Sequence, residues 1–290
     1  MHVSVNGVRL FFDVEGAKFV PDGPLMREKP VLLMLHGGPG ADHSIYRPAY
    51  AALADIAQIV YLDHRGNGRS EDGPRAGWNL AQWGDDVHAF CEALGIVDPI
   101  VLGASFGGMV ALAYATRHPT HPSKLILIST EAAGRTHLER RVELFERFGG
   151  AEVGALARRQ FFEVKGHTGQ ASLEVWRRLA IPHYFRTKRD PDMGRRGVNR
   201  SEVLLWFAGP DGESQRFNFF PDLHRIQCPT LVLGGEDDPM HPIESQADIA
   251  AALPTHLVQF ERFADCGHAV MPDAPGRATA VIRDFIARPK

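Results

Sequence analysis

Six short apolar runs, spaced along most of the chain, constrain the fold more than any other feature of the sequence. A strand with one face in water alternates apolar and polar residues, whereas a strand covered on both faces is apolar almost throughout. The runs are Val31–Leu35, Ile59–Leu62, Ile100–Leu102, Leu125–Ile128, Leu231–Leu233 and Leu257–Phe260. They predict a mostly parallel sheet that is buried on both faces.

Segments with helical spacing lie between several of these runs. Apolar residues recur every three or four positions in Ala81–Leu94, and Met109–Arg117 has the same character. Strands and helices therefore alternate, an order typical of α/β proteins in which helices cover both faces of the sheet.

The start of the chain has a different pattern. Two alternating stretches, His2–Val5 and Val8–Val14, flank the pair Asn6-Gly7. An Asn-Gly pair between such stretches is a strong signal for a two-residue hairpin turn. We expect the sheet to begin with an antiparallel hairpin, followed by a loop that contains proline and glycine.

The interval 131–221 interrupts the alternation of strands and helices. It is rich in Arg and Glu and has no comparable strand run, but it carries aromatic residues at helical spacing. These are Phe145, Phe148, Phe161, Phe162 and Trp176. We predict a helical cap at 131–221, inserted into a core formed by residues 1–130 and 222–290.

Composition and charge exclude several classes of partner. Lys plus Arg number 32 and Asp plus Glu 35, so the formal net charge is −3 and favours neither nucleic acid nor an anionic membrane. No stretch approaches the roughly 20 apolar residues of a membrane span, and the first residues lack the apolar run of a signal peptide. We expect a cytoplasmic protein with a small-molecule or short-peptide substrate; no sequence feature specifies its oligomeric state.

The cysteines indicate neither a disulfide framework nor a metal centre. Cys91, Cys228 and Cys266 are scattered, without C-x-x-C or Cys/His ligand spacing. We expect three reduced thiols, and no metal or organic cofactor.

A candidate nucleophile lies in Gly103-Ala104-Ser105-Phe106-Gly107, which fits the pattern G-x-S-x-G. A predicted strand precedes it and a predicted helix follows it, as the pattern requires. Ser105 would occupy a strained turn, so residues two positions before and after it must be very small for the backbones to pass. The N–H groups at the start of the helix would point to where an oxyanion forms.

Two later strand ends supply a candidate acid and a candidate base. In sheets of this kind the carboxylate and then the histidine follow the serine along the chain. His268 follows the last predicted strand, and Asp237 and Asp238 follow the one before it. We favour Asp238, because the next residue is a proline that stiffens the turn, with Asp237 as the alternative. His241 lies too close along the chain to the acid to serve as the base.

The loop after Val31–Leu35 reads His36-Gly37-Gly38-Pro39-Gly40. Glycines expose backbone N–H groups without obstruction, so Gly37 or Gly38 could pair with the Phe106 N–H as an oxyanion hole. We expect His36 to brace this loop.

Five motifs together resemble the proline iminopeptidase branch of the α/β-hydrolases. They are HGGPG (36–40), DHRGNGRS (63–70), GASFGG (103–108), GEDDPMHP (235–242) and CGH (266–268). The resemblance covers about two thirds of the chain, and it implies the α/β-hydrolase fold: a mostly parallel eight-stranded sheet with helices on both faces and an inserted helical cap.

The resemblance also implies site residues. It implies a catalytic triad of Ser105, Asp238 and His268, with Gly37 or Gly38 and Phe106 as oxyanion donors. In that family the positions of Arg65, Gly66 and Ser70 belong to a structural turn.

The sequence departs from that branch where the substrate amine would bind. Relatives commonly have a tryptophan after the serine, where this chain has Phe106, and a Trp-Glu pair in the cap, which is absent here. Four cap glutamates could bind an amine from other positions, although solvated helix faces are their simpler interpretation: Glu163, Glu174, Glu202 and Glu213.

These observations leave three functions open. The first is a serine hydrolase of the proline iminopeptidase kind that acts through an acyl-enzyme. The second is a carboxylesterase or lactonase with an apolar acyl pocket, for which the candidate lining is Phe106, Phe145, Phe161, Trp176 and Trp206. The third is a non-catalytic receptor for a small ligand, which has no physical need for a complete triad.

Overall fold

An eight-stranded sheet forms the centre of the computed structural model, which describes residues 1–188 and 192–289. Its strands, in spatial order, are β1 (His2–Val5), β2 (Val8–Glu15), β6 (Gln58–Leu62), β5 (Val31–Leu35), β7 (Ile100–Ala104), β8 (Lys124–Ile128), β9 (Thr230–Gly235) and β10 (Val258–Phe263). The six strands from β6 to β10 run parallel to one another. Strand β2 is antiparallel both to β6 and to β1. The predicted fold class is confirmed.

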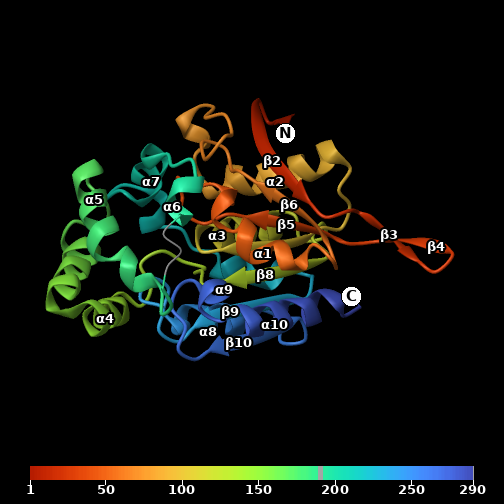
Figure 1. Cartoon of the computed structure of the whole chain (residues 1–290). Coiled ribbons are helices and arrows are strands. Elements are labelled where there is room, and N and C mark those ends of the chain that lie inside the picture. Colours follow the sequence, from red (N-terminus) through yellow and green to blue (C-terminus); the bar gives the residue numbers. More distant parts are fainter. Residues whose placement is uncertain (189–191, 290) are drawn as a thin grey trace.

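Alternate residues of the central strands pack on opposite faces of the sheet. On β5, Leu33 and Leu35 join one apolar core, and Leu32 and Met34 join another. Helices α2 (Leu80–Leu94), α3 (Phe106–Arg117) and α8 (Ile243–Ala252) contribute to the first core. Helices α1 (Arg47–Tyr50), α9 (Val270–Asp273) and α10 (Pro275–Ala287) contribute to the second. Helices therefore cover both faces, as the unbroken apolar runs predicted (Figure 1).

The N-terminal hairpin also forms as predicted, with Val5 paired to Val8 across the Asn6-Gly7 turn. The following segment is not the plain loop that we expected. It forms a second antiparallel hairpin from β3 (Phe19–Asp22) and β4 (Leu25–Glu28), which projects beyond the sheet in Figure 1. Its side chains are largely exposed, so the hydrophobic pattern of a buried strand is absent.

Among the described residues, four α-helices lie between β8 and β9, and we call this stretch the cap segment. They are α4 (Leu138–Arg158), α5 (Gln170–Leu179), α6 (Met193–Arg196) and α7 (Ser201–Ala208). Figure 1 shows α4 and α5 at the end of the molecule opposite the β3–β4 hairpin. Val142 and Phe145 of α4 pack with Trp176 of α5 in a small apolar core. The division into core and cap at 131–221 stays a prediction.

No helix in the described part of the chain is both long and apolar enough to cross a membrane.

Candidate active site

Ser105 lies at the sharp turn from β7 to α3, with a backbone φ of +54°. A positive φ is uncommon for a residue other than glycine. The two flanking glycines are necessary, because a Cβ on Gly103 would lie 2.2 Å from the Gly107 oxygen and one on Gly107 would lie 2.0 Å from the Leu35 oxygen. The close backbone approach expected of G-x-S-x-G is therefore present.

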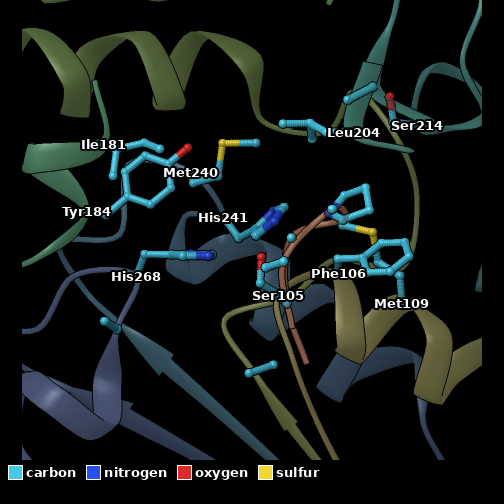
Figure 2. A pocket seen from close by; sticks show the side chains of 18 of the residues that line it. Ser105, Phe106, Met109, Ile181, Tyr184, Leu204, Ser214, Met240, His241 and His268 are labelled. Atoms are coloured by element: carbon cyan, nitrogen blue, oxygen red, sulfur yellow. The ribbon is translucent and has the colours of Figure 1, made fainter. Parts of the chain in front are cut away.

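A cavity of about 620 Å³ opens above the carboxyl ends of the strands, between the sheet and the cap segment. Ser105 and His268 both line it. Figure 2 shows the imidazole of His268 pointing toward the hydroxyl of Ser105. Residues from the ends of β7 and β10 thus meet on one wall.

Asp238 contacts His268 from behind. Its Oδ2 lies 2.9 Å from the Nδ1 of His268, and its Oδ1 accepts the backbone N–H groups of Met240 at 2.8 Å and His241 at 2.9 Å. The Asp238 side chain is completely buried. Asp237 instead lies 3.6 Å from Arg147 at the surface. Of the two candidate acids, only Asp238 is in contact with the histidine.

The cap segment helps to hold His268. The backbone N–H of His268 donates to the Tyr184 carbonyl at 2.7 Å, and the two rings meet edge to face with centroids 5.1 Å apart. His241, the competing histidine, lies with its ring 5.3 Å from that of His268 and does not contact the Asp238 carboxylate through its ring. The base predicted from the sequence is the one that the fold brings to the acid.

In the glycine loop after β5, the two candidate oxyanion donors, Gly37 and Gly38, differ in whether their N–H group already has an acceptor. The Gly37 N–H donates to the Tyr46 hydroxyl at 2.7 Å. The N–H groups of Gly38 and Phe106 have no acceptor among residues 1–188 and 192–289. His36 braces the loop as expected: it contacts the Gly37 oxygen at 2.7 Å through Nδ1 and accepts the His64 N–H at 3.1 Å through Nε2.

A buried ionic group that we did not predict adjoins the cavity. Glu131 and Arg141 form a close ion pair, and both are about 95% buried. Burial acts to raise the pKa of Glu131, but the charge of Arg141, together with the interaction with His241, outweighs it and holds that pKa at about 2. The Nδ1 of His241 lies 3.7 Å from the same carboxylate, and burial lowers the pKa of His241. Glu131 is therefore ionised and already neutralised by a protein cation.

Other cations of the cap segment also line the cavity. Arg135 donates to the Gln215 side chain, Arg177 donates to the Ser201 hydroxyl, and Lys165 is exposed. None of the three forms an ion pair with a carboxylate in the described part of the chain. Among the described residues, Asp42 is the other acidic residue on the wall, and it pairs with Arg69. The described part of the wall consequently carries more positive than negative charge.

Only some of the pocket residues predicted from the sequence line the cavity. Among the five candidate aromatic residues, Phe106, Phe161 and Trp176 line the cavity, whereas Phe145 is buried in the cap core and Trp206 is 46% exposed. None of the four candidate glutamates lines it. Glu163, Glu174 and Glu202 are exposed, and Glu213 accepts the Leu80 N–H at the start of α2.

Sequence reasoning missed Glu131, Arg141, Tyr46 and Tyr184. One signal could have pointed to Glu131: it closely follows β8, whose carboxyl end lies at the same sheet edge as Ser105. The other three lie in irregular segments or on the cap, where spacing along the chain indicates no partner.

Comparisons with known proteins agree with this architecture. The chain is 26% identical over 282 residues to RutD of Caulobacter sp. (strain K31), provisionally assigned as a carbamate hydrolase, with 96% of each chain covered. It is 26% identical over 250 residues to a proline iminopeptidase of Lactiplantibacillus plantarum (strain ATCC BAA-793 / NCIMB 8826 / WCFS1), covering 82% of this chain and 84% of the relative.

Solved structures show the same fold. The crystal structure of proline iminopeptidase from Mycobacterium smegmatis superposes with a TM-score of 0.80 at 23% identity, covering 99% of this chain and 97% of that one. The family model of the α/β hydrolase fold matches residues 30–275, which is most of the chain. The protein is thus a hydrolase that belongs to the α/β hydrolase fold family.

Proposed function

We propose that the protein is a serine hydrolase that cleaves small esters or amides through an acyl-enzyme on Ser105. One observation carries the proposal: the buried carboxylate of Asp238 contacts Nδ1 of an imidazole that points toward Ser105. A carboxylate in this position holds the tautomer whose Nε2 is free to accept the serine proton.

In the proposed reaction Ser105 Oγ attacks the carbonyl carbon while Nε2 of His268 accepts the hydroxyl proton. The tetrahedral intermediate collapses when His268 returns that proton to the departing alcohol or amine. Water then attacks the acyl-enzyme by the same route and releases a carboxylic acid. No cofactor is required for these steps.

The N–H groups of Gly38 and Phe106 are the donors that we assign to the oxyanion. Both flank Ser105 on the cavity wall and neither has an acceptor in the described residues. Gly37 is less suited to this role, because its N–H already donates to Tyr46. Each such donor contributes about 3 kcal/mol to stabilising the transition state.

The charge on the cavity wall favours an acyl group that is neutral or anionic. Glu131 is neutralised by Arg141 and Asp42 by Arg69, while Arg135, Lys165 and Arg177 have no carboxylate partner in the described residues. A substrate ammonium group would meet these cations without an available carboxylate. Apolar residues of the wall, such as Phe161, Leu173 and Trp176, would accommodate an aliphatic acyl chain.

Three p-nitrophenyl esters that differ in acyl charge test this substrate class. We expect p-nitrophenyl butyrate and mono-p-nitrophenyl succinate to have a kcat/KM at least about 10-fold above that of the L-alanine ester, a difference of about 1.4 kcal/mol. Because the leaving group is the same, the comparison isolates the acyl side. A preference for the cationic ester would contradict the assignment.

A proline iminopeptidase is the second candidate, supported by the HGGPG loop and by the similarity to the L. plantarum enzyme. It requires recognition of a free substrate amine. Faster cleavage of L-proline p-nitroanilide than of its N-acetyl derivative would favour this function over the first.

Labelling with a fluorophosphonate tests the nucleophile and separates both enzymes from a receptor. We expect the protein to gain one covalent label and Ser105→Ala to gain none, with turnover lost and the unfolding temperature nearly unchanged. An unlabelled wild-type protein, or an active Ser105→Ala variant, would overturn the proposed mechanism.

A further inference from the structure

Three side chains able to bind a metal ion come together away from Ser105. His88 and Glu92 lie one turn apart on α2, and His121 lies in the turn between α3 and β8. Their ligand atoms are all within 4.8 Å of one another, and Nε2 of His121 is 3.8 Å from Oε1 of Glu92. Because β8 starts just after His121, the cluster lies at the amino edge of the parallel sheet, opposite the candidate active site.

The three donors have the chemistry of a zinc site. Two imidazole nitrogens and one carboxylate oxygen bind Zn²⁺ tetrahedrally when water or another ligand occupies the fourth position. Residues four apart on a helix project from the same face, which directs His88 and Glu92 to one point. The Glu92 side chain is 66% exposed, so it can change rotamer to shorten its distance to an ion.

Neighbouring side chains contact both imidazoles. The hydroxyl of Tyr114 forms a close hydrogen bond with Nδ1 of His121, leaving Nε2 as the nitrogen directed at Glu92. The ring of His118 stacks on that of His88 with centroids 4.1 Å apart and planes 10° apart. Nε2 of His118 contacts Asp85 at 2.9 Å, so His118 supports the cluster from one side. Hydrogen bonds to the second ring nitrogen are a regular feature of metal-binding histidines.

We propose that His88, Glu92 and His121 bind a zinc ion that joins α2 to the turn after α3. From the ligand spacing along the chain we expected no metal, because here the ligands come from two separate elements. The site lies at the edge of the sheet away from Ser105, so its effect is on stability and not on the hydrolytic reaction.

Calorimetric titration of the untagged protein with Zn²⁺ tests the proposal. The tag is omitted because its histidines would bind zinc, and the three cysteines are buried and do not compete. We expect one saturable site, and a rise in unfolding temperature of roughly 3 °C or more at saturating zinc. Absence of saturable binding by the wild-type protein would overturn the proposal.

Three variants test the ligands, a fourth tests the supporting tyrosine, and a fifth is the control. His88→Ala, His121→Ala and the conservative Glu92→Gln should each weaken zinc binding more than Tyr114→Phe, for which we expect about a 10-fold loss. His256→Ala, which removes an exposed histidine before β10, is the matched control and should bind as the wild type does. Esterase activity should be the same in Glu92→Gln and the wild type. Unchanged zinc binding in Glu92→Gln and in either histidine variant would show that the ion binds elsewhere.

Discussion

Asp238 divides its two carboxylate oxygens between His268 and its own loop: Oδ2 lies 2.9 Å from the imidazole, while Oδ1 accepts two backbone N–H groups. The loop thus holds the carboxylate in place independently of its contact with the histidine. This arrangement makes Asp238 a fixed support for the imidazole.

The first prediction concerns the acid. Asp238→Asn keeps the shape of the side chain but presents an amide to His268, which favours the wrong imidazole tautomer. We expect kcat to fall by about 10⁴-fold. Asp237→Asn is the matched control, since Asp237 faces Arg147 at the surface, and it should retain nearly full activity. Ester hydrolysis under saturating substrate measures both, and equal losses in the two variants would contradict the assignment of Asp238.

The second prediction concerns Tyr46, whose hydroxyl accepts the Gly37 N–H. Tyr46→Phe leaves that N–H without its partner beside the loop that supplies Gly38, so we expect kcat to fall roughly 10-fold, equivalent to about 1.4 kcal/mol. Tyr50→Phe removes a neighbouring tyrosine hydroxyl that does not contact Gly37, and it serves as the control. If both variants keep the wild-type kcat, Tyr46 does not position the loop.

The third prediction concerns the buried pair Glu131–Arg141. Glu131→Gln leaves the Arg141 charge buried without its partner, so the free energy of unfolding should fall by about 3–5 kcal/mol. The double variant Glu131→Gln/Arg141→Met removes the charge as well, and it should recover most of that loss. Urea unfolding followed by circular dichroism measures both. Equal stability of the single and double variants would show that the two side chains are not coupled.

The fourth prediction concerns stability at low pH. Burial and the nearby charge of Arg177 lower the pKa of His167 from 6.5 to about 4. Between these values the unfolded chain binds a proton at this position and the folded protein does not, so stability falls as the pH is lowered from 6.5 to 4. One pKa unit corresponds to about 1.4 kcal/mol, so the loss approaches about 3 kcal/mol.

His167→Gln should remove this part of the pH dependence, since glutamine can still accept the Gln160 side-chain N–H. His256→Gln, at an exposed position, should leave the dependence unchanged. The free energy of unfolding of each variant, measured between pH 4 and 7, tests this prediction. If it depends on pH in the same way in His167→Gln and in the wild type, the prediction is refuted.

The core was predictable from sequence because each central strand is buried on both faces. Val31–Leu35 has no polar residue, and the structure pairs it on both sides within the sheet. The turn at Ser105 was predictable for a related reason: only glycine fits at Gly103 and Gly107, and that requirement appears directly in the sequence.

The cavity wall was less predictable because its contacts join distant segments. Trp206 is an aromatic residue of the kind that lines pockets, yet it lies outside the cavity, is 46% exposed and donates to the Trp78 carbonyl. The ionised state of Glu131 could not be predicted, because it depends on two residues from other elements. Arg141 lies on α4, and His241 lies in the loop after β9. No local pattern encodes such a meeting of three segments.

Strands β8 and β9 are neighbours in the sheet although the whole cap segment separates them in sequence, and Leu125 pairs directly with Thr230. The ladder between these strands does not depend on the length or shape of what connects them. Evolution can therefore exchange or remodel the connecting helices, which line part of the cavity, without rebuilding the sheet that positions Ser105 and His268.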